Sequence, residues 1–329
     1  MYTGLVIILA LALAFAEGNA LDVHNDLTPD GNVNYCPSLK CIDDNHINTV
    51  PNTKLLEEIS GEPSSDRNTR WSLLAIDPQN DFITGSLKVP GADEDLSRTI
   101  SFLESIDQQK IRDIFVTLDT HGEDHIAHDP SLLTYPDGSY LPDFTTVTVH
   151  DIESGTVLVK TGMEKIFLQY LKDLEERGKY QYTKWPPHCV KGTDGHLVPS
   201  ELRDQLVTWP SVQYIEKGSN RMTEMYSALS AEVPQENDPS TQLNTDLINS
   251  LNENDYVIVF GQAKSHCVKA TVEDYLDHIG PNTKIILLKD LTSSVPGFDH
   301  LGTELEKTLI SKGHIVSTST SDEVSLLLR

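Results

Sequence analysis

The sequence has few basic residues and few long apolar runs. Lysine and arginine together number 25, against 50 aspartate and glutamate residues, so the 329-residue chain has a formal net charge of −25. A surplus of acid this large argues against nucleic acid and anionic membrane surfaces as partners. The acidic residues are spread along the chain rather than gathered in a tail, and this distribution favours a role in solubility.

A single apolar run, at 5–16, resembles a targeting segment, and it is too short to cross a bilayer. Small residues follow it, so we predict a signal peptide at 1–20 that is cleaved after Ala20, with a site after Ala16 as the alternative. An uncleaved anchor is the other interpretation. The signal peptide predicts a protein that is secreted or held in the lumen of the secretory pathway.

Cysteine is also scarce, at four residues. Secretion permits disulfides, and Cys36 and Cys41 are close enough in sequence to pair locally. Four cysteines allow three pairings, among which the sequence does not choose. Cys189 and Cys267 lie within motifs that carry chemistry, so we expect both to be reduced in the active protein.

The remaining chain divides into a polar, turn-rich extension at 21–68 and one large domain at 69–329. Apolar strand patterns in the domain alternate with helical patterns, and a long excursion at 130–182 interrupts them. This alternation predicts an α/β domain whose mostly parallel sheet is covered by helices on both faces. The expected strands are 71–76, 113–118, 211–216, 256–260, 284–288 and 314–318, with two strand-like segments, 145–149 and 156–160, inside the excursion; the expected helices are 96–106, 163–177, 267–279 and 301–311.

Reactive side chains follow the ends of four of these strands. Asp77, Asp119 and Lys217 come directly after strands, and Cys267 follows the short turn after another. Ligands of open parallel sheets bind beyond the carboxyl ends of the strands. We therefore expect an acid, a base and a thiol to converge at one edge of the sheet.

Cys267 lies where a strand passes through a tight turn into a helix, a layout that presents a nucleophile. The start of a helix carries partial positive charge, so a thiol there is expected to lose its proton more easily. The alternative is that Cys267 is a small buried apolar residue, as many free cysteines are.

Five motifs occur in the order found in nicotinamidases and the wider isochorismatase-like cysteine hydrolases, which the chain resembles over roughly residues 71–329. They are LLAIDPQNDF, VTLDTHGEDHIAH, WPPHCVKGTDG, EKGSN followed by YSAL, and GQAKSHCVKAT. The resemblance implies a Rossmann-like domain with a six-stranded, mostly parallel sheet and a small-molecule amide as substrate. The resemblance is also compatible with a homo-oligomer.

The resemblance also implies a catalytic triad of Asp77, Lys217 and Cys267. Cys267 would attack the substrate, Asp77 would take the thiol proton and pass it to ammonia, and Lys217 would stabilise the charges. The N–H groups of Ala263 and Cys267 would form the oxyanion hole, with a cis peptide bond between Gln262 and Ala263. A salt bridge at the edge of the sheet is the alternative for Asp77 and Lys217.

A second cluster implied by the resemblance is a metal site made by Asp119, His121 and His188. Imidazole and carboxylate ligands suit zinc first, with manganese or iron as alternatives. His125 matches a further histidine of the family that binds metal in some members only. We interpret His128 as a solvated loop histidine.

Three aromatic residues, Phe82, Trp185 and Tyr226, match positions that enclose the substrate ring in nicotinamidases, and the alternative is that they are plain core residues. Two departures from the family pattern bear on the substrate: Ser265 and Met225 stand where the family usually has aspartate. The sequence therefore favours a metal-assisted nicotinamidase. The alternatives are hydrolysis of another small amide or ureide, and a catalytically silent, secreted metal-binding module.

Overall fold

The computed structural model describes residues 69–322, 324 and 328. The predicted signal peptide, the extension at 21–68, Cys36 and Cys41 lie outside the described residues. The domain is built on one six-stranded sheet in the order β10-β9-β8-β1-β2-β7, and every neighbouring pair in it is parallel. Its strands are β1 (Trp71–Ile76), β2 (Ile111–Asp119), β7 (Val212–Lys217), β8 (Tyr256–Gly261), β9 (Lys284–Leu288) and β10 (Ile315–Ser317). The predicted six-stranded, mostly parallel α/β sheet is thus confirmed.

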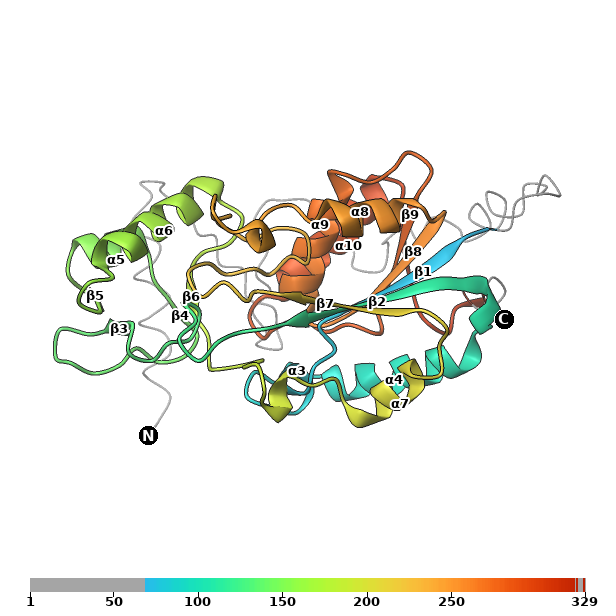
Figure 1. Ribbon diagram of the computed structural model, residues 1–329, viewed down its shortest axis with the longest axis horizontal. Coiled ribbons are helices and arrows are strands. Elements are labelled where there is room, and N and C mark those ends of the chain that lie inside the picture. The colour runs from blue at the N-terminus through green and yellow to red at the C-terminus, as the bar shows by residue number, and fades with distance from the viewer. Residues whose placement is uncertain (1–68, 323, 325–327, 329) are drawn as a thin grey trace, which may run out of the picture. The chain divides into compact units, whose positions relative to one another are not determined.

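Helices cover both faces of this sheet (Figure 1). Alternate residues of β1 point to opposite faces, so Leu73 and Ala75 pack into one apolar cluster while Leu74 and Ile76 pack into the other. All six β1 residues are buried, as a central parallel strand requires. On one face lie α3 (Asn80–Ile83), α4 (Ala92–Ser105) and α7 (Ser200–Leu206), and on the other lie α8 (Thr245–Asn252), α9 (Lys269–Leu276) and α10 (Asp299–Ser311).

The six sheet strands and the helices at 96–106, 163–177 and 301–311 are found within a few residues of their predicted ends. The sequence reading missed α3, α7 and α8, which are short. The predicted strand at 145–149 is wrong beyond its first two residues. Thr148 instead caps a helix, because its side chain accepts from the Asp151 N–H while the Asp151 carboxylate accepts from the Thr148 N–H.

Most of the residues in one apolar cluster, including Phe167, Tyr170 and Leu171, come from the excursion at 130–182, and Ile126 and Val233 join them from outside it. The elements of the excursion are β3 (Leu133–Thr134), β4 (Thr145–Thr146), α5 (Val149–Glu153), β5 (Leu158–Val159) and α6 (Glu164–Arg177), and β4 pairs with β6 (Thr183–Lys184) beyond it. Single turns of 3₁₀ helix occur at η1 (Gln108–Lys110), η2 (Asp194–His196) and η3 (Pro239–Thr241). Within the described residues, no helix is both long and apolar enough to cross a bilayer.

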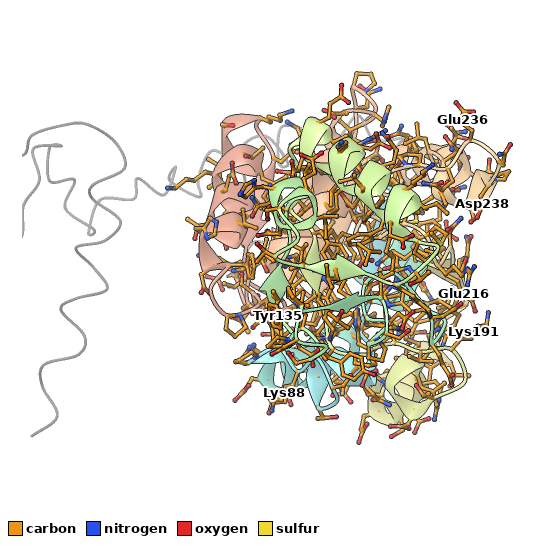
Figure 2. The ribbon with its side chains drawn as sticks, turned by 90° about the vertical axis from the view of Figure 1, so that its left-hand side faces the viewer. Lys88, Tyr135, Lys191, Glu216, Glu236 and Asp238 are labelled. Atoms are coloured by element: carbon orange, nitrogen blue, oxygen red, sulfur yellow. The ribbon has the colours of Figure 1, made fainter. Side chains whose placement is uncertain are left out.

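Strand β7 lies at the edge of the sheet. Its successive side chains point to opposite faces, so one lysine points inward. Glu216 is exposed and pairs with Lys191 at 2.6 Å on the surface, where Figure 2 shows the two side chains together. The next residue, Lys217, points the other way and is 3% exposed. The strand therefore delivers one buried ammonium group to the carboxyl end of the sheet.

Candidate active site

The chain reaches Cys267 through a turn that only glycine permits at its first residue. Gly261 has φ +116°, and a Cβ there would lie 2.1 Å from the Ile76 carbonyl oxygen. The Gln262–Ala263 peptide that follows is cis, as the resemblance implied. Cys267 then lies in a single π-helical turn, η4 (Lys264–Val268), that leads into α9. Helical structure therefore begins three residues before Cys267, earlier than the sequence pattern predicted.

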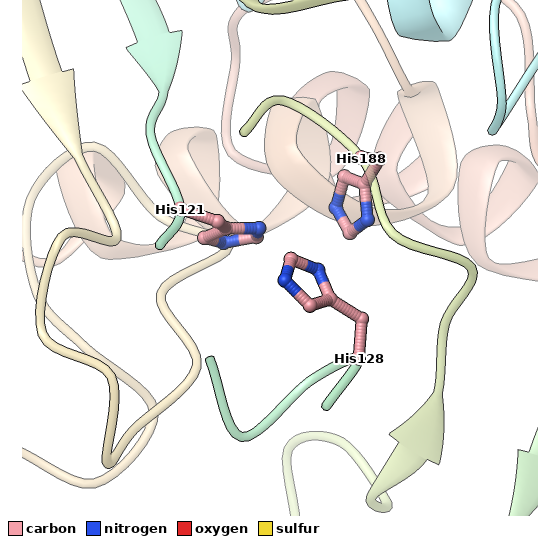
Figure 3. Close-up of side chains that lie close together, drawn as sticks. All are labelled: His121, His128 and His188. Atoms are coloured by element: carbon pink, nitrogen blue, oxygen red, sulfur yellow. The ribbon is translucent and has the colours of Figure 1, made fainter. Parts of the chain in front are cut away.

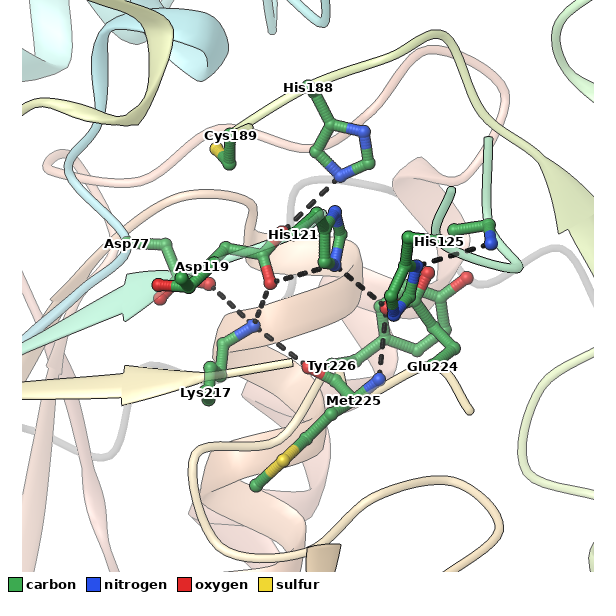
Figure 4. Close-up of polar contacts among 12 residues, drawn as sticks. Asp77, Asp119, His121, His125, His188, Cys189, Lys217, Glu224, Met225 and Tyr226 are labelled. Carbon is green, nitrogen blue, oxygen red and sulfur yellow. Dashed lines mark hydrogen bonds and ion pairs between the residues drawn. The ribbon is translucent and has the colours of Figure 1, made fainter. Parts of the chain in front are cut away.

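Lys217 contacts the other two predicted catalytic side chains, and Figure 4 shows its contact with Asp77. Its Nζ lies 3.0 Å from Asp77 Oδ2 and 3.7 Å from Cys267 Sγ. It also donates to the Met225 carbonyl oxygen at 2.9 Å. The Thr117 hydroxyl donates to Asp77 Oδ1 at 2.5 Å and thereby fixes the carboxylate. The structure thus brings together the three side chains that sequence reasoning assigned to one site.

Burial controls the protonation of this cluster. It raises the pKa of the Cys267 thiol well above its ordinary value, and the nearby Lys217 ammonium only partly offsets this. The expectation that the thiol ionises easily is therefore not met. Burial also raises the pKa of Asp77, against the opposing charge of Lys217. Burial disfavours the charged form of Lys217 too, but Asp119 and Asp77 hold its pKa well above the ordinary value. The resting thiol of Cys267 is therefore held in its protonated form, close to the paired side chains of Asp77 and Lys217.

The predicted oxyanion hole has one donor without a partner. The Ala263 N–H donates to no acceptor within the described part of the chain, while the Ala263 carbonyl accepts from the N–H groups of His266 and Val268. These two hydrogen bonds hold the peptide in the turn that carries Cys267. The Ala263 N–H is consequently available for an oxygen that develops negative charge.

The predicted metal ligands Asp119, His121 and His188 also meet. Asp119 Oδ1 lies 3.3 Å from His121 Nε2, and Asp119 Oδ2 lies 3.3 Å from His188 Nε2. The two contacts use different oxygens of the carboxylate. Within the described residues, the groups whose ligand atoms all lie within 4.8 Å of one another are His121, His128 and His188, and His121, His125 and Glu224. The carbonyl of Pro186 accepts from His188 Nδ1 at 2.8 Å, which leaves Nε2 free to coordinate.

Two further observations fit a metal at this position. His121 is buried and neither ring nitrogen has a hydrogen-bond partner within the described residues. Gly218 lies alongside, where a Cβ would come within 3.0 Å of Asp119 Oδ1 and 3.1 Å of His121 Nε2. Glycine therefore keeps open the space that these ligand atoms face. Lys217 Nζ also lies 3.0 Å from Asp119 Oδ1, so one ammonium links the triad to the metal cluster.

Sequence reasoning misjudged one residue of this cluster and missed another. His128 is 1% exposed and faces His121 and His188, so its interpretation as a solvated loop residue is wrong. Glu224 was not predicted, although its Oε1 lies 3.5 Å from His121 Nε2. The histidines His121 and His125 lower the pKa of Glu224 to about 2 despite its burial. The sequence signal for Glu224 is its position two residues before Tyr226 of the YSAL motif.

The three predicted aromatic residues line a narrow pocket that Cys267 also lines. Phe82, Trp185 and Tyr226 form its walls, and Trp185 Nε1 donates to the Tyr226 hydroxyl at 2.9 Å. His266, which sequence reasoning did not single out, forms part of the same wall. Burial lowers the pKa of His266 to about 4, so it is neutral near pH 7.

Hydrogen bonds from Gln79 and Asp81, which follow β1, hold the site residues in place. The Gln79 side chain donates to the Asp119 carbonyl at 2.8 Å and accepts from the Asp119 N–H at 2.7 Å. Asp81 Oδ2 accepts from the Cys189 N–H at 2.7 Å, next to His188. Cys189 and Cys267 are both free thiols, as expected.

The two departures from the family pattern have structural explanations. Met225 contacts Lys217 through its carbonyl oxygen, so the lysine depends little on the side chain at this position. Ser265 Oγ accepts from the Val295 N–H at 3.1 Å and lies 2.9 Å from His266 Nδ1. Ser265 thereby fixes the orientation of the pocket histidine.

Comparisons with known proteins bear on the fold and on the class of reaction. No family model matches the chain. The chain is 28% identical over 220 residues to the nicotinamidase of Saccharomyces cerevisiae, covering 66% of this chain and 85% of the relative. A solved structure of yeast nicotinamidase superposes with a TM-score of 0.53 at 25% identity, covering 75% of this chain and 99% of that one. An Acinetobacter baumannii nicotinamidase and pyrazinamidase shares the fold, with a TM-score of 0.53, 20% identity and coverage of 78% and 98%. The chain is thus similar in sequence and in fold to nicotinamidases, which supports a hydrolase that acts on amide carbon–nitrogen bonds.

Proposed function

We propose that this protein is a metal-assisted cysteine amidohydrolase that converts nicotinamide and water into nicotinate and ammonia. One observation carries the proposal: a buried ammonium, Lys217, lies 3.0 Å from Asp77, 3.0 Å from Asp119 and 3.7 Å from Cys267 Sγ. It couples a nucleophile and its base to a cluster of metal ligands across one narrow pocket. The yeast relative is named a nicotinamidase.

In the first half of the reaction, Cys267 Sγ attacks the amide carbon while its proton moves to Asp77. The carbonyl oxygen becomes an oxyanion, to which the N–H groups of Ala263 and Cys267 donate. Asp77 then gives its proton to the amide nitrogen, the carbon–nitrogen bond breaks, and ammonia leaves. A thioester between Cys267 and the acyl group remains.

In the second half, water attacks the thioester carbon and gives a proton to Asp77. The same N–H groups hold the second oxyanion. The carbon–sulfur bond then breaks, and the proton on Asp77 returns to the sulfur. Lys217 stays protonated throughout and offsets the negative charge that moves between Asp77 and Cys267, because two carboxylates hold its pKa well above the ordinary value.

Asp119, His121 and His188 would hold the divalent ion, and their proximity and the unpartnered ring nitrogens of His121 support this assignment. When bound, the ion supplies a Lewis-acid position for the pyridine nitrogen of the substrate. Phe82, Trp185 and Tyr226 would enclose the pyridine ring of the substrate.

Ammonia release from nicotinamide and from benzamide tests this substrate, because the two differ at one ring atom. We expect kcat/KM to be at least about 100-fold higher for nicotinamide, since benzamide has no nitrogen to bind the metal. The Cys267→Ala variant should release no ammonia above background from either. Equal rates on the two amides would contradict the role given to the metal cluster.

A second candidate function is hydrolysis of another small amide or ureide. The neutral His266 in the pocket wall and the Ser265 that orients it favour this alternative, because they alter the surface next to the nucleophile. Ammonia release from other amides, with none from nicotinamide, would select it. Metal binding without hydrolysis of any amide would indicate a silent metal-binding module.

The predicted location is a separate proposal that rests on the sequence alone. We propose that 1–20 direct the chain into the secretory pathway and are removed there. Expression of the full chain in a secreting eukaryotic host should yield protein in the medium whose N-terminal residue is Leu21. Retention of full-length protein inside the cells would contradict this.

A further inference from the structure

His128 is a buried side chain that the mechanism above does not use. It is 1% exposed, and its Nε2 lies 2.9 Å from the Gly122 carbonyl oxygen. A carbonyl oxygen only accepts, so Nε2 carries the ring proton and donates to it. In the neutral ring Nδ1 is then an acceptor with a free lone pair.

This free nitrogen has no hydrogen-bond partner anywhere in the described part of the chain, although it is buried. An unsatisfied buried polar atom costs about 1–3 kcal/mol and calls for an explanation. His121, His128 and His188 each offer a ring nitrogen, and these atoms lie within 4.8 Å of one another. Figure 3 shows the three rings turned toward one another.

His125, three residues earlier in the same loop, provides the contrast. Its Nδ1 accepts from the Ala127 N–H at 3.2 Å, and its Nε2 lies 3.2 Å from the Thr223 carbonyl oxygen, to which it donates. Both ring nitrogens are therefore engaged by backbone groups. The ring stacks on His121 with centroids 4.0 Å apart. Although His125 also lies close to His121 and Glu224, it has no free lone pair for a metal.

We propose that His128 Nδ1 is a ligand of the metal, in addition to Asp119, His121 and His188. The inference rests on the proposed function only in taking a metal to bind at this cluster. Four protein ligands would close a tetrahedral site, whereas a substrate needs an open position. A site with four protein ligands and room for a substrate would suit an ion that accepts more than four ligands, such as manganese or iron.

The test compares metal binding by purified full-length protein and by two matched variants, His128→Asn and His125→Asn. Each protein is freed of metal and titrated with Mn²⁺ and Co²⁺ in competition with a chromophoric chelator. We expect His128→Asn to weaken binding by at least about 10–100-fold and to shift the Co²⁺ absorption bands. The His125→Asn variant should keep both the affinity and the bands. Thermal unfolding of the metal-free proteins shows whether each variant is folded before it is titrated.

The outcomes separate the two proposals. Unchanged affinity and Co²⁺ bands in a folded His128→Asn variant would overturn the fourth ligand and leave the nicotinamidase proposal standing. If His128→Asn weakens binding while the unsubstituted protein hydrolyses no nicotinamide, the ligand assignment holds and the substrate fails. If the unsubstituted protein binds neither ion, the ligand assignment fails. If His128→Asn does not fold, the Co²⁺ spectrum of His128→Gln is compared in its place, and unchanged bands there would overturn the assignment.

Discussion

In the Lys217→Met variant we expect amide hydrolysis to fall by about 10²–10³-fold and the free energy of unfolding to fall by about 3–5 kcal/mol. The methionine has a similar length but no charge. Asp77 and Asp119 each lie 3.0 Å from Lys217 Nζ and are almost fully buried, so both would lose a partner that they cannot replace with water. Steady-state kinetics and urea unfolding of metal-free protein measure the two effects.

Lys269→Met is the matched control, because Lys269 is also a lysine of low exposure. Its carboxylate partners, Glu273 and Glu304, lie nearer the solvent. A pair of this kind contributes about 0–1 kcal/mol, so Lys269→Met should change stability little and leave kcat/KM unchanged. Equal loss of stability in the two variants would show that Lys217 is an ordinary buried lysine rather than the charge that holds the site together.

The Asp77→Asn variant should lose about 10²–10⁴-fold in kcat/KM and change its pH dependence. In the unsubstituted protein the base must be ionised, so activity should rise with pH through the pKa of Asp77, which burial raises above 3.8, and then level off. In the variant the thiol must ionise by itself. Burial holds its pKa well above the ordinary value, so the residual rate should keep rising into the alkaline range.

Asp113→Asn is the control for this experiment, because Asp113 lies near the start of β2, where its carboxylate accepts from the Ser211 hydroxyl. Its pH profile should match that of the unsubstituted protein. A pH profile for Asp77→Asn with the same shape as the original would mean that another group takes the thiol proton.

The strand pattern alone predicted where three of the reactive residues lie. Asp77, Asp119 and Lys217 each come at or just after the end of a parallel strand, and adjacent strands place those ends side by side in the sheet. This prediction needed only the recognition of apolar runs. The resemblance supplied the roles of these residues. It also predicted the cis peptide bond and the position of His188, which lies in a segment outside the sheet strands.

The loop residues were harder to predict because tertiary contacts decide their environment. Nothing in the local sequence indicates that His125 is satisfied by the backbone of Ala127 and Thr223 while His128 keeps a free nitrogen. The thiol was misjudged for a related reason. The helix dipole is a local effect that sequence reveals, whereas the burial that raises the pKa of Cys267 comes from the whole pocket.

The most direct test of the proposed catalytic machinery is to look for the covalent intermediate on its sulfur. Protein mixed with nicotinamide at saturating concentration is quenched in acid within the first turnovers, digested, and analysed by peptide mass spectrometry. We predict a nicotinoyl group on the peptide that contains Cys267, and none on the Cys189 peptide or on the Cys267→Ala protein. Turnover of nicotinamide by the Cys267→Ala protein, or an acyl group carried by any other residue, would contradict the assignment of Cys267 as the nucleophile.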